Sequence, residues 1–257
     1  YNKYPELFSD EEHRVIKTPR GKNTVSDRMK VISSFFKWCE TNKLIDWNPF
    51  TQYKIEQQVY GTPYYISIEE RNKLYHTNLS RHPFYEKMRD IFIFQCVIGC
   101  RISDLYSLTK KNLFDNYIQY VPRKTKDKTP KTVKVPLNSI AKEILQKYSS
   151  LENESLLPFA SEYHYNKAIK KIFLAAGLTR PVVVIDAVTR EQVIKPLNEI
   201  ASSHIARRTF IGNLYKKVQD PSLISALSGH EEGSRAFLRY RNIDDEIKEQ
   251  LVKLLEQ

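Results

Sequence analysis

The chain has 257 residues and a formal net charge of +11, because 41 lysines and arginines outnumber 30 aspartates and glutamates. This length is sufficient for a substantial core and two domains. The positive charge favours a polyanionic partner, most simply nucleic acid, although charge alone also fits a generically basic protein. The sequence contains no run of about 18 apolar residues, and we expect neither a membrane span nor a signal peptide.

The three cysteines, Cys39, Cys96 and Cys100, form no Cys-x-x-Cys pair. Cys96 and Cys100 lie in an apolar stretch and are expected to be small core residues, not metal ligands or a disulfide. Few cysteines without a pattern are typical of a reducing cytoplasm. We therefore expect a cytoplasmic protein without a metal or another cofactor. Because the sequence begins at Tyr1 and not at methionine, we also expect a fragment of a longer chain.

The N-terminal region predicts one long helix followed by a linker. Residues 1–22 contain few apolar positions and end as a loop. Thr24 is expected to cap a helix from Val25 to Asn42, whose apolar residues recur at helical spacing. Residues 51–64 have no clear period and contain a Gly-Thr-Pro sequence, which places a linker between two domains there.

The next segment predicts two helices and an arginine at a turn. Ser67 is expected to cap the first helix, which has two glutamates in its first turn. Phe84–Cys100 is apolar on most sides and predicts a buried helix that ends at Gly99. Arg101 then lies at the start of a turn and a further short helix. A guanidinium beside a buried helix is costly unless it meets an anion, which could be a ligand or a carboxylate of the protein.

The middle of the chain predicts a small antiparallel sheet between helices. Residues 117–121 and 132–135 alternate as strands around a turn, 123–131, that contains five lysines and arginines. This turn is either a solvated hairpin or a basic finger beside a polyanion. Helices are expected at Ser139–Tyr148 and at Glu162–Ala176.

A second hairpin, with strands at 182–186 and 193–197, precedes the last helices. The fold class is therefore mainly α with a small antiparallel β-sheet, that is, α+β.

The C-terminal part of the chain contains a concentrated polar pattern. A predicted helix carries His204 and Arg207, which are three residues apart and so project from the same face of its first turn. A short helix from Pro221 to Leu227 is followed by Ser-Gly and then His230, and Tyr240 comes ten residues later. Two imidazoles, a guanidinium and a phenol indicate a site for a phosphate and its proton transfers.

This pattern resembles the signature of the tyrosine recombinases, the phage-integrase-like enzymes. The signature here is a His-x-x-Arg helix, then Leu-x-Gly-His, then a tyrosine about one short helix later. The family also has a Gly-x-Arg-x-Ser-Asp/Glu-Leu turn, which matches Gly99–Leu105. It has a hairpin lysine ahead of a Val-Pro-Leu strand end, which matches Lys124-Thr125 and Val135–Leu137. The elements occur in the family's order over roughly residues 20–245.

The resemblance implies a catalytic domain and a set of catalytic residues. The arginines would grip the non-bridging oxygens of a phosphodiester, and the histidines would donate to the same oxygens or accept the tyrosine proton. Tyr240 would attack phosphorus, leaving a 3′-phosphotyrosine and a 5′-hydroxyl, and a lysine would protonate the leaving oxygen. Lys124 is favoured for this role, with Lys126 as the alternative. Tyr215 lies within a helix without a preceding Gly-His and is set aside. The implied catalytic set is Arg101, Lys124, His204, Arg207, His230 and Tyr240.

The resemblance also implies how the chain contacts DNA. The basic turn would place Arg123, Lys126 and Lys128 beside the DNA backbone. Arg208 stands where many members have histidine and is interpreted as a phosphate or carboxylate contact. Residues 1–58 would be part of a helical, DNA-clamping core-binding domain plus a linker, and residues 59–257 would be the tyrosine-recombinase catalytic domain.

We therefore expect a site-specific recombinase that acts as the integrase of a mobile element. The second hairpin resembles that of integrases from mobile elements of the Bacteroidetes. The protein would act without a metal on double-stranded DNA as a homotetramer, in the bacterial cytoplasm and on the nucleoid when bound. An apolar stripe from Ile243 to Leu255 could pack in cis or join subunits in trans, and accessory DNA-bending proteins are compatible with this function. The alternatives are a type IB topoisomerase and a non-catalytic DNA-binding protein on the same fold.

Overall fold

The structure is a computed structural model that describes residues 19–125, 130–218 and 220–230, together with Phe237, Arg239 and Val252. The chain divides into two compact units. The first unit comprises Tyr1–Gly61 and Val183–Ile194, and the second comprises Thr62–Val182 and Lys195–Gln257. The predicted domain boundary, between residues 58 and 59, lies close to Gly61–Thr62, where the chain first passes from one unit to the other. The predicted hairpin, however, groups with the N-terminal residues.

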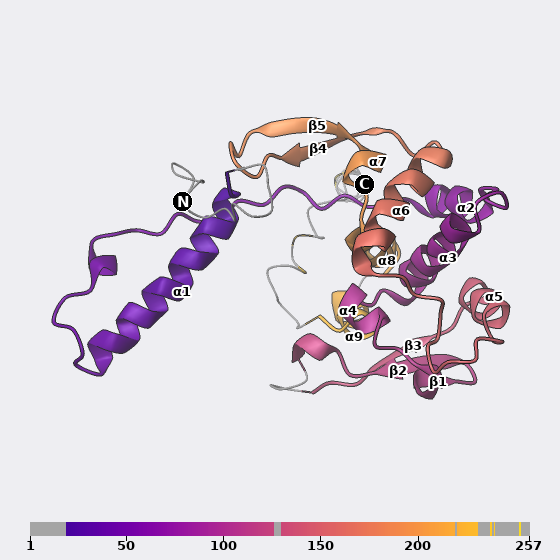
Figure 1. The fold of residues 1–257 in the computed structure, drawn as a ribbon, viewed down its shortest axis with the longest axis horizontal. Coiled ribbons are helices and arrows are strands. Elements are labelled where there is room, and N and C mark those ends of the chain that lie inside the picture. The colour runs from indigo at the N-terminus through magenta and orange to yellow at the C-terminus, as the bar shows by residue number, and fades with distance from the viewer. Residues whose placement is uncertain are drawn as a thin grey trace, which may run out of the picture. The chain divides into compact units, whose positions relative to one another are not determined.

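The first unit is built on α1 (Lys22–Thr41), the long helix drawn in indigo in Figure 1. The predicted helix is confirmed, but the prediction that Thr24 caps it is wrong. The helix begins at Lys22 after Gly21, which makes no side-chain cap. Instead, the amide of Lys22 donates to the carbonyl of Ala187, at 2.8 Å. A carbonyl from a distant segment thus satisfies one of the free amides at the helix start, which a capping side chain would otherwise do.

That distant segment is the hairpin of β4 (Pro181–Ile185) and β5 (Gln192–Pro196), which confirms the predicted strands. Its turn is held by Asp186, whose carboxylate accepts from the amides of the two residues Val188 and Thr189, at 2.8 and 2.9 Å. Arg190 donates to the carbonyl of Gln57 at 3.0 Å and pairs with Glu56, also at 3.0 Å. The hairpin turn therefore holds both the start of α1 and the segment that follows it.

The second unit is organised around α3 (Pro83–Ile98), on which every residue from Asp90 to Ile98 is buried. It packs against α2 (Ile68–His76), α5 (Ser139–Lys147), α6 (Glu162–Ala175) and α8 (Ser203–Tyr215). Because these helices cover α3 on several sides, an all-round apolar sequence is required there. The predicted cap of α2 is confirmed, since Ser67 and Glu70 form a capping box.

A three-stranded antiparallel sheet lies at one edge of the second unit (Figure 1). Its strands are β1 (Leu113–Phe114), β2 (Tyr117–Tyr120) and β3 (Val133–Pro136), in that order. Alternate residues of the β2–β3 pair are buried, as the predicted alternation requires. The two predicted strands and the α+β class are confirmed, whereas β1 is two residues long and has no detectable period.

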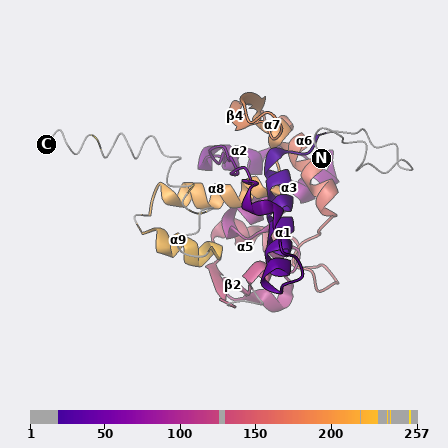
Figure 2. The same ribbon diagram turned by 90° about the vertical axis from the view of Figure 1, so that its left-hand side faces the viewer.

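Short elements complete the second unit. They are α4 (Ile102–Leu105), η4 (Lys110–Asn112), η5 (Arg123–Thr125), α7 (Leu197–Ile200) and α9 (Pro221–Ser228). Helices α8 and α9 pack side by side, as Figure 2 shows. No helix in the described part of the chain is long and apolar enough to cross a membrane.

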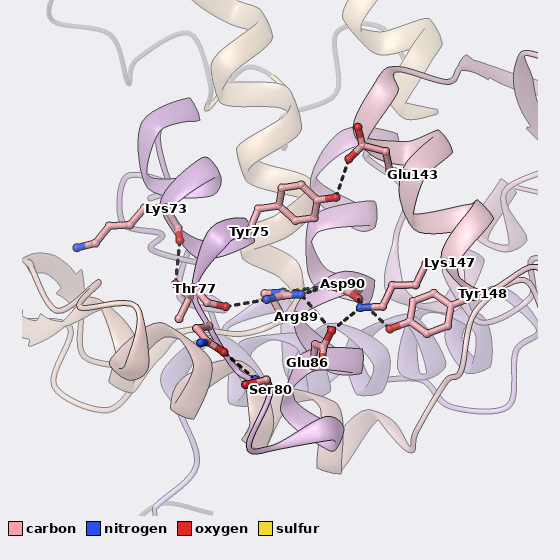
Figure 3. A network of polar contacts seen from close by, with 11 residues as sticks. Lys73, Tyr75, Thr77, Ser80, Glu86, Arg89, Asp90, Glu143, Lys147 and Tyr148 are labelled. Carbon is pink, nitrogen blue, oxygen red and sulfur yellow. Dashed lines mark hydrogen bonds and ion pairs between the residues drawn. The ribbon is translucent and has the colours of Figure 1, made fainter.

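A buried ionic network fastens α3 to α5 (Figure 3). Its centre is Asp90, which is 1% exposed. Arg89 donates twice to one carboxylate oxygen, at 2.9 and 2.8 Å, while Lys147 and Tyr148 donate to the other, at 2.7 and 2.8 Å. Partial burial opposes the charge of Lys147, but its hydrogen bonds to Asp90 and Glu86 outweigh burial and raise its pKa. The buried carboxylate is therefore fully paired, which is the condition for tolerating it in a core.

Candidate active site

Arg207 is a buried anchor in the centre of the candidate site. The residue is 2% exposed, and one guanidinium nitrogen donates to the carbonyls of Gly99 at 2.8 Å and Ser228 at 2.7 Å. These carbonyls lie at the C-terminal ends of α3 and α9, where backbone oxygens have no partner within the helix and carry partial negative charge. The guanidinium therefore joins two helix ends from a third helix, α8.

Gly99 is required for this junction. It ends α3 with a φ of +73°, a left-handed conformation that favours glycine. A Cβ atom at this position would lie 2.3 Å from the ring of Phe210 on α8. The missing side chain thus lets α8 approach the end of α3 and brings Arg207 within reach of the Gly99 carbonyl.

Arg101, which lies far earlier in the chain, contacts the same C-terminal end of α9. It precedes α4, and its guanidinium donates weakly to the carbonyl of Gly229, at 3.5 and 3.4 Å. Asp104 lies 3.9 Å away, which is the outer limit of an ion pair. Because these contacts are long and the side chain remains 22% exposed, the guanidinium is still accessible to an external anion. The structure thus contains the alternative, a salt bridge to a carboxylate of the protein, only at this long distance, and the guanidinium can also meet a ligand.

His230 lies beside Arg207 and directly follows Gly229, whose carbonyl Arg101 contacts. Its Nδ1 is 2.9 Å from the Ser228 hydroxyl, and its ring nitrogens are 3.0 and 3.2 Å from a guanidinium nitrogen of Arg207. Burial, followed by the charges of Arg207 and Arg101, lowers the pKa of His230 to about 3. The imidazole is therefore neutral near pH 7, so it can donate one N–H and accept at its other nitrogen.

His204 also belongs to this cluster. Loss of solvation, followed by the charges of Arg208 and Arg207, lowers its pKa to about 4. This loss of solvation is only partial, since His204 remains exposed, unlike Arg207 three positions further along α8. Both histidines are thus neutral at physiological pH, and the positive charge of the cluster comes from its guanidinium groups.

Lys124 lies in η5, and its charge is among those that lower the pKa of His230. A carboxylate missed by the sequence reasoning holds this segment. Asp104 accepts from the amide of Arg123 at 2.9 Å, while its second oxygen faces Arg101 and has no hydrogen-bond partner in the described part of the chain. Its position within the arginine motif was the one available signal. Asp104 links the arginine turn to the lysine segment.

The remaining predicted site residues have different outcomes. The guanidinium of Arg208 lies over the ring of Tyr64, 5.0 Å from its centre, so its phosphate contact stays a prediction. Lys126, Lys128 and Tyr240 lie outside the described residues, as do all residues of the apolar stripe. Arg123 is exposed beside Lys124.

Phe237 shows where the chain runs shortly before Tyr240. It is 3% exposed, and its ring packs against His230 and Tyr215, with centres 5.2 and 5.3 Å apart. Tyr215, which the sequence reasoning set aside as nucleophile, thus contributes its ring to an apolar cluster on α8. A described residue three positions before Tyr240 therefore contacts the imidazole of the site.

The site can bind an anion with fixed donors. Two guanidinium groups, two neutral imidazoles and a nearby ammonium come from four separate segments of the chain. Such preorganised donors suit the oxygens of a phosphodiester better than those of a carboxylate, because several converge on one group. This arrangement suits the chemistry that the sequence predicts, which is phosphate binding with proton transfer.

Comparison with known proteins gives the family. The sequence model of the phage integrase family matches residues 65–246, which is more than half of the chain. The chain belongs to this family. Tyrosine recombinase XerC of Bacillus subtilis strain 168 is 25% identical over 235 residues, covering 88% of this chain and 72% of that protein. XerC of Pediococcus pentosaceus is 25% identical over 222 residues, covering 82% and 68%.

Solved structures share the fold. Lambda integrase residues 75–356 bound to DNA gives a TM-score of 0.62 at 15% identity, covering 87% of this chain and 77% of that one. The XerH recombinase in a post-cleavage complex gives 0.55 at 18% identity. That alignment covers 77% of this chain, which spans 54% of the XerH chain. The predicted recombinase family and catalytic fold are confirmed, and the resemblance to Bacteroidetes integrases stays a prediction.

Proposed function

We propose that this protein is a site-specific DNA recombinase that cleaves and rejoins DNA strands through a 3′-phosphotyrosine intermediate. The observation that carries the proposal is the meeting of Arg101 and Arg207 at the end of α9, directly beside His230. The family supports it, because related proteins are named tyrosine recombinases. Integration or excision of a mobile element is the biological role that fits this activity.

In the proposed cleavage step, the arginines, histidines, tyrosine and lysine have separate roles. Arg101 and Arg207 bind the non-bridging oxygens and stabilise the charge that grows on them. The neutral histidines donate hydrogen bonds to these oxygens or accept the phenolic proton of Tyr240. The phenolate oxygen forms a bond to phosphorus as the bond from phosphorus to the 5′ oxygen breaks. Lys124 donates the proton that this leaving oxygen needs.

Rejoining is the reverse reaction, so it consumes no external energy source. The 5′-hydroxyl attacks the phosphotyrosine, and the phenol leaves with a proton returned by the same groups. Every charge in this scheme is supplied by side chains, and the proposed reaction includes no metal step. Lys124 is preferred to Lys126 because it forms the Lys-Thr pair that resembles the family's hairpin motif, and its charge acts on His230.

The proposed partner is double-stranded DNA, and the proposed assembly is a homotetramer. Related structures are described as a lambda integrase dimer on a core site and as a tetramer on a Holliday junction. The first unit would clamp DNA as a core-binding domain, and the basic segment around Arg123 would contact its backbone. The C-terminal stripe could join subunits, and accessory DNA-bending proteins could assist. The proposed location is the bacterial cytoplasm, on the nucleoid when bound.

The experiment uses a nicked suicide duplex that carries the element's end sequence, or a random library if that sequence is unknown. After incubation with EDTA and denaturation, protein linked covalently to DNA is measured. We expect a linked product that Tyr240→Phe abolishes and that Tyr215→Phe, the matched control, retains. A product that survives Tyr240→Phe would disprove the assigned nucleophile.

The same assay separates the two alternative functions. DNA binding without any linked product on a confirmed site would favour a non-catalytic DNA-binding protein. Linked product together with relaxation of supercoils, but without strand exchange between two duplexes, would favour a type IB topoisomerase.

A further inference from the structure

Two consecutive residues of α6, Tyr165 and Asn166, contact both halves of the candidate site. Helix α6 packs on α3 and on α8, and it carries no residue of the predicted catalytic set. Each of the two contacts leads to the residue that directly precedes a predicted catalytic residue. One holds the residue immediately before Arg101, and the other holds the residue immediately before His204.

The first contact is a buried relay from α6 to the arginine turn. The Tyr165 hydroxyl donates to the side-chain oxygen of Gln95, at 3.2 Å. The side-chain nitrogen of Gln95 donates in turn to the carbonyl of Cys100, at 3.1 Å. All three residues are at most 1% exposed. Because no water can replace these partners cheaply, the relay fixes the backbone from which Arg101 projects.

The second contact holds the start of the helix that carries His204. The cap residue of α8, Ser202, accepts no hydrogen bond with its side chain. The carboxamide oxygen of Asn166 accepts from the amide of Ser203 instead, at 2.8 Å. Ser203 is 4% exposed, so its amide needs a partner within the protein. Asn166 therefore provides, from another helix, a partner for one of the free amides at the start of α8.

We propose that Gln95 and Asn166 are positioning residues, through which α6 sets the separation of Arg101 and His204 in the active site. This inference rests on the proposed recombinase function. The two residues touch no reacting group and act on backbone atoms adjacent to those that do. Since catalysis depends on donor positions to within about 1 Å, losing either contact reduces strand cleavage more than it reduces DNA binding.

Asn166 gives the sharper test because its substitution can be matched. Asn166→Ala removes the acceptor, whereas Asn166→Asp keeps an oxygen at the helix start, where negative charge is favourable. Asn138→Ala is the matched control, because Asn138 caps α5 through the amide of Ala141 at 2.9 Å, away from the predicted catalytic residues. Tyr165→Phe tests the other contact, because it removes the hydroxyl that donates to Gln95.

The measurement is the single-turnover rate of covalent linkage on the suicide duplex at saturating protein, with DNA affinity and thermal unfolding measured in parallel. We expect Asn166→Ala to lower the rate about 10- to 100-fold. Asn166→Asp and Asn138→Ala should stay within about threefold of the parent, and Tyr165→Phe should fall between. DNA affinity should change less than about threefold in every variant.

A second readout does not require cleavage. The imidazole signals of His204 are followed by NMR in the free protein, where Asn166→Ala should shift them and Asn138→Ala should not. Unchanged His204 signals with an unchanged cleavage rate in Asn166→Ala would overturn the positioning role. If the parent protein forms no linked product, the proposed function fails, and the NMR comparison still decides the positioning role.

Discussion

The two arginines of the site should respond differently to the same substitution, lysine. Arg207 donates to two helix-end carbonyls at 2.8 and 2.7 Å and is 2% exposed, whereas the contacts of Arg101 are 3.4 Å or longer and its side chain is 22% exposed. A lysine has one compact ammonium group and cannot reproduce the planar fork of arginine. Arg207→Lys should therefore damage both structure and catalysis, and Arg101→Lys mainly catalysis.

The expected sizes follow from these contacts. A hydrogen bond from a charged donor contributes about 1.5–3 kcal/mol, and a buried carbonyl left without a partner adds a similar penalty. Losing one of the two anchor bonds should lower the free energy of unfolding by about 3 kcal/mol for Arg207→Lys. For a chain of this size that corresponds to a fall in Tm of about 6–12 °C. Arg101→Lys should change the free energy of unfolding by less than about 1 kcal/mol, because its contacts are long and partly solvated.

Two assays separate these effects. Urea unfolding at pH 7 gives stability, and covalent linkage on the suicide duplex at 10 °C gives catalysis while both variants remain folded. Both variants should lose about 100- to 1,000-fold in rate, because each removes an oxyanion donor. Equal stability of the two variants would refute the anchoring role of Arg207. A normal cleavage rate in Arg101→Lys would refute its role in binding phosphate.

Three further predictions concern other parts of the second unit. Asp90→Asn should lower the free energy of unfolding by about 2–3 kcal/mol, measured in urea, because it removes the buried charge that Lys147 and Arg89 share while Glu86 still pairs with Lys147. The folded-state pKa of His230 lies below its unfolded value, so this group's stability contribution is complete above about pH 6.5 and is lost as the pH falls toward 3. Between pH 7 and pH 5 the parent should lose about 2 kcal/mol more in urea unfolding than His230→Gln does, and equal losses would contradict the shift. Asp104→Asn should keep the acceptor for the Arg123 amide but slow covalent linkage about tenfold, because the charge facing Arg101 is gone; Asp104→Ala should slow it further.

Local spacing was sufficient to predict much of the fold. The long apolar run of α3 needed partners on several sides, and the alternation in β2 and β3 placed one face of the sheet in the core. The capping box at Ser67 was equally local. Such features depend on residues within a few positions of one another, so periodicity and capping chemistry determine them. The spacing of His204 and Arg207 on α8 belongs to the same class.

Only the tertiary structure decided which distant groups meet. The start of α1 was mispredicted because its first amide bonds to a hairpin carbonyl from far along the chain, a partner that no local pattern contains. Asp104 and Asn166 were missed as supports of the site for the same reason, since their hydrogen bonds end on Arg123 and Ser203. Hydrogen bonds across long sequence separations depend on how helices pack. The sequence by itself determined which residues could bind a phosphate, and the packing of α3, α6, α8 and α9 determined which groups hold them in place.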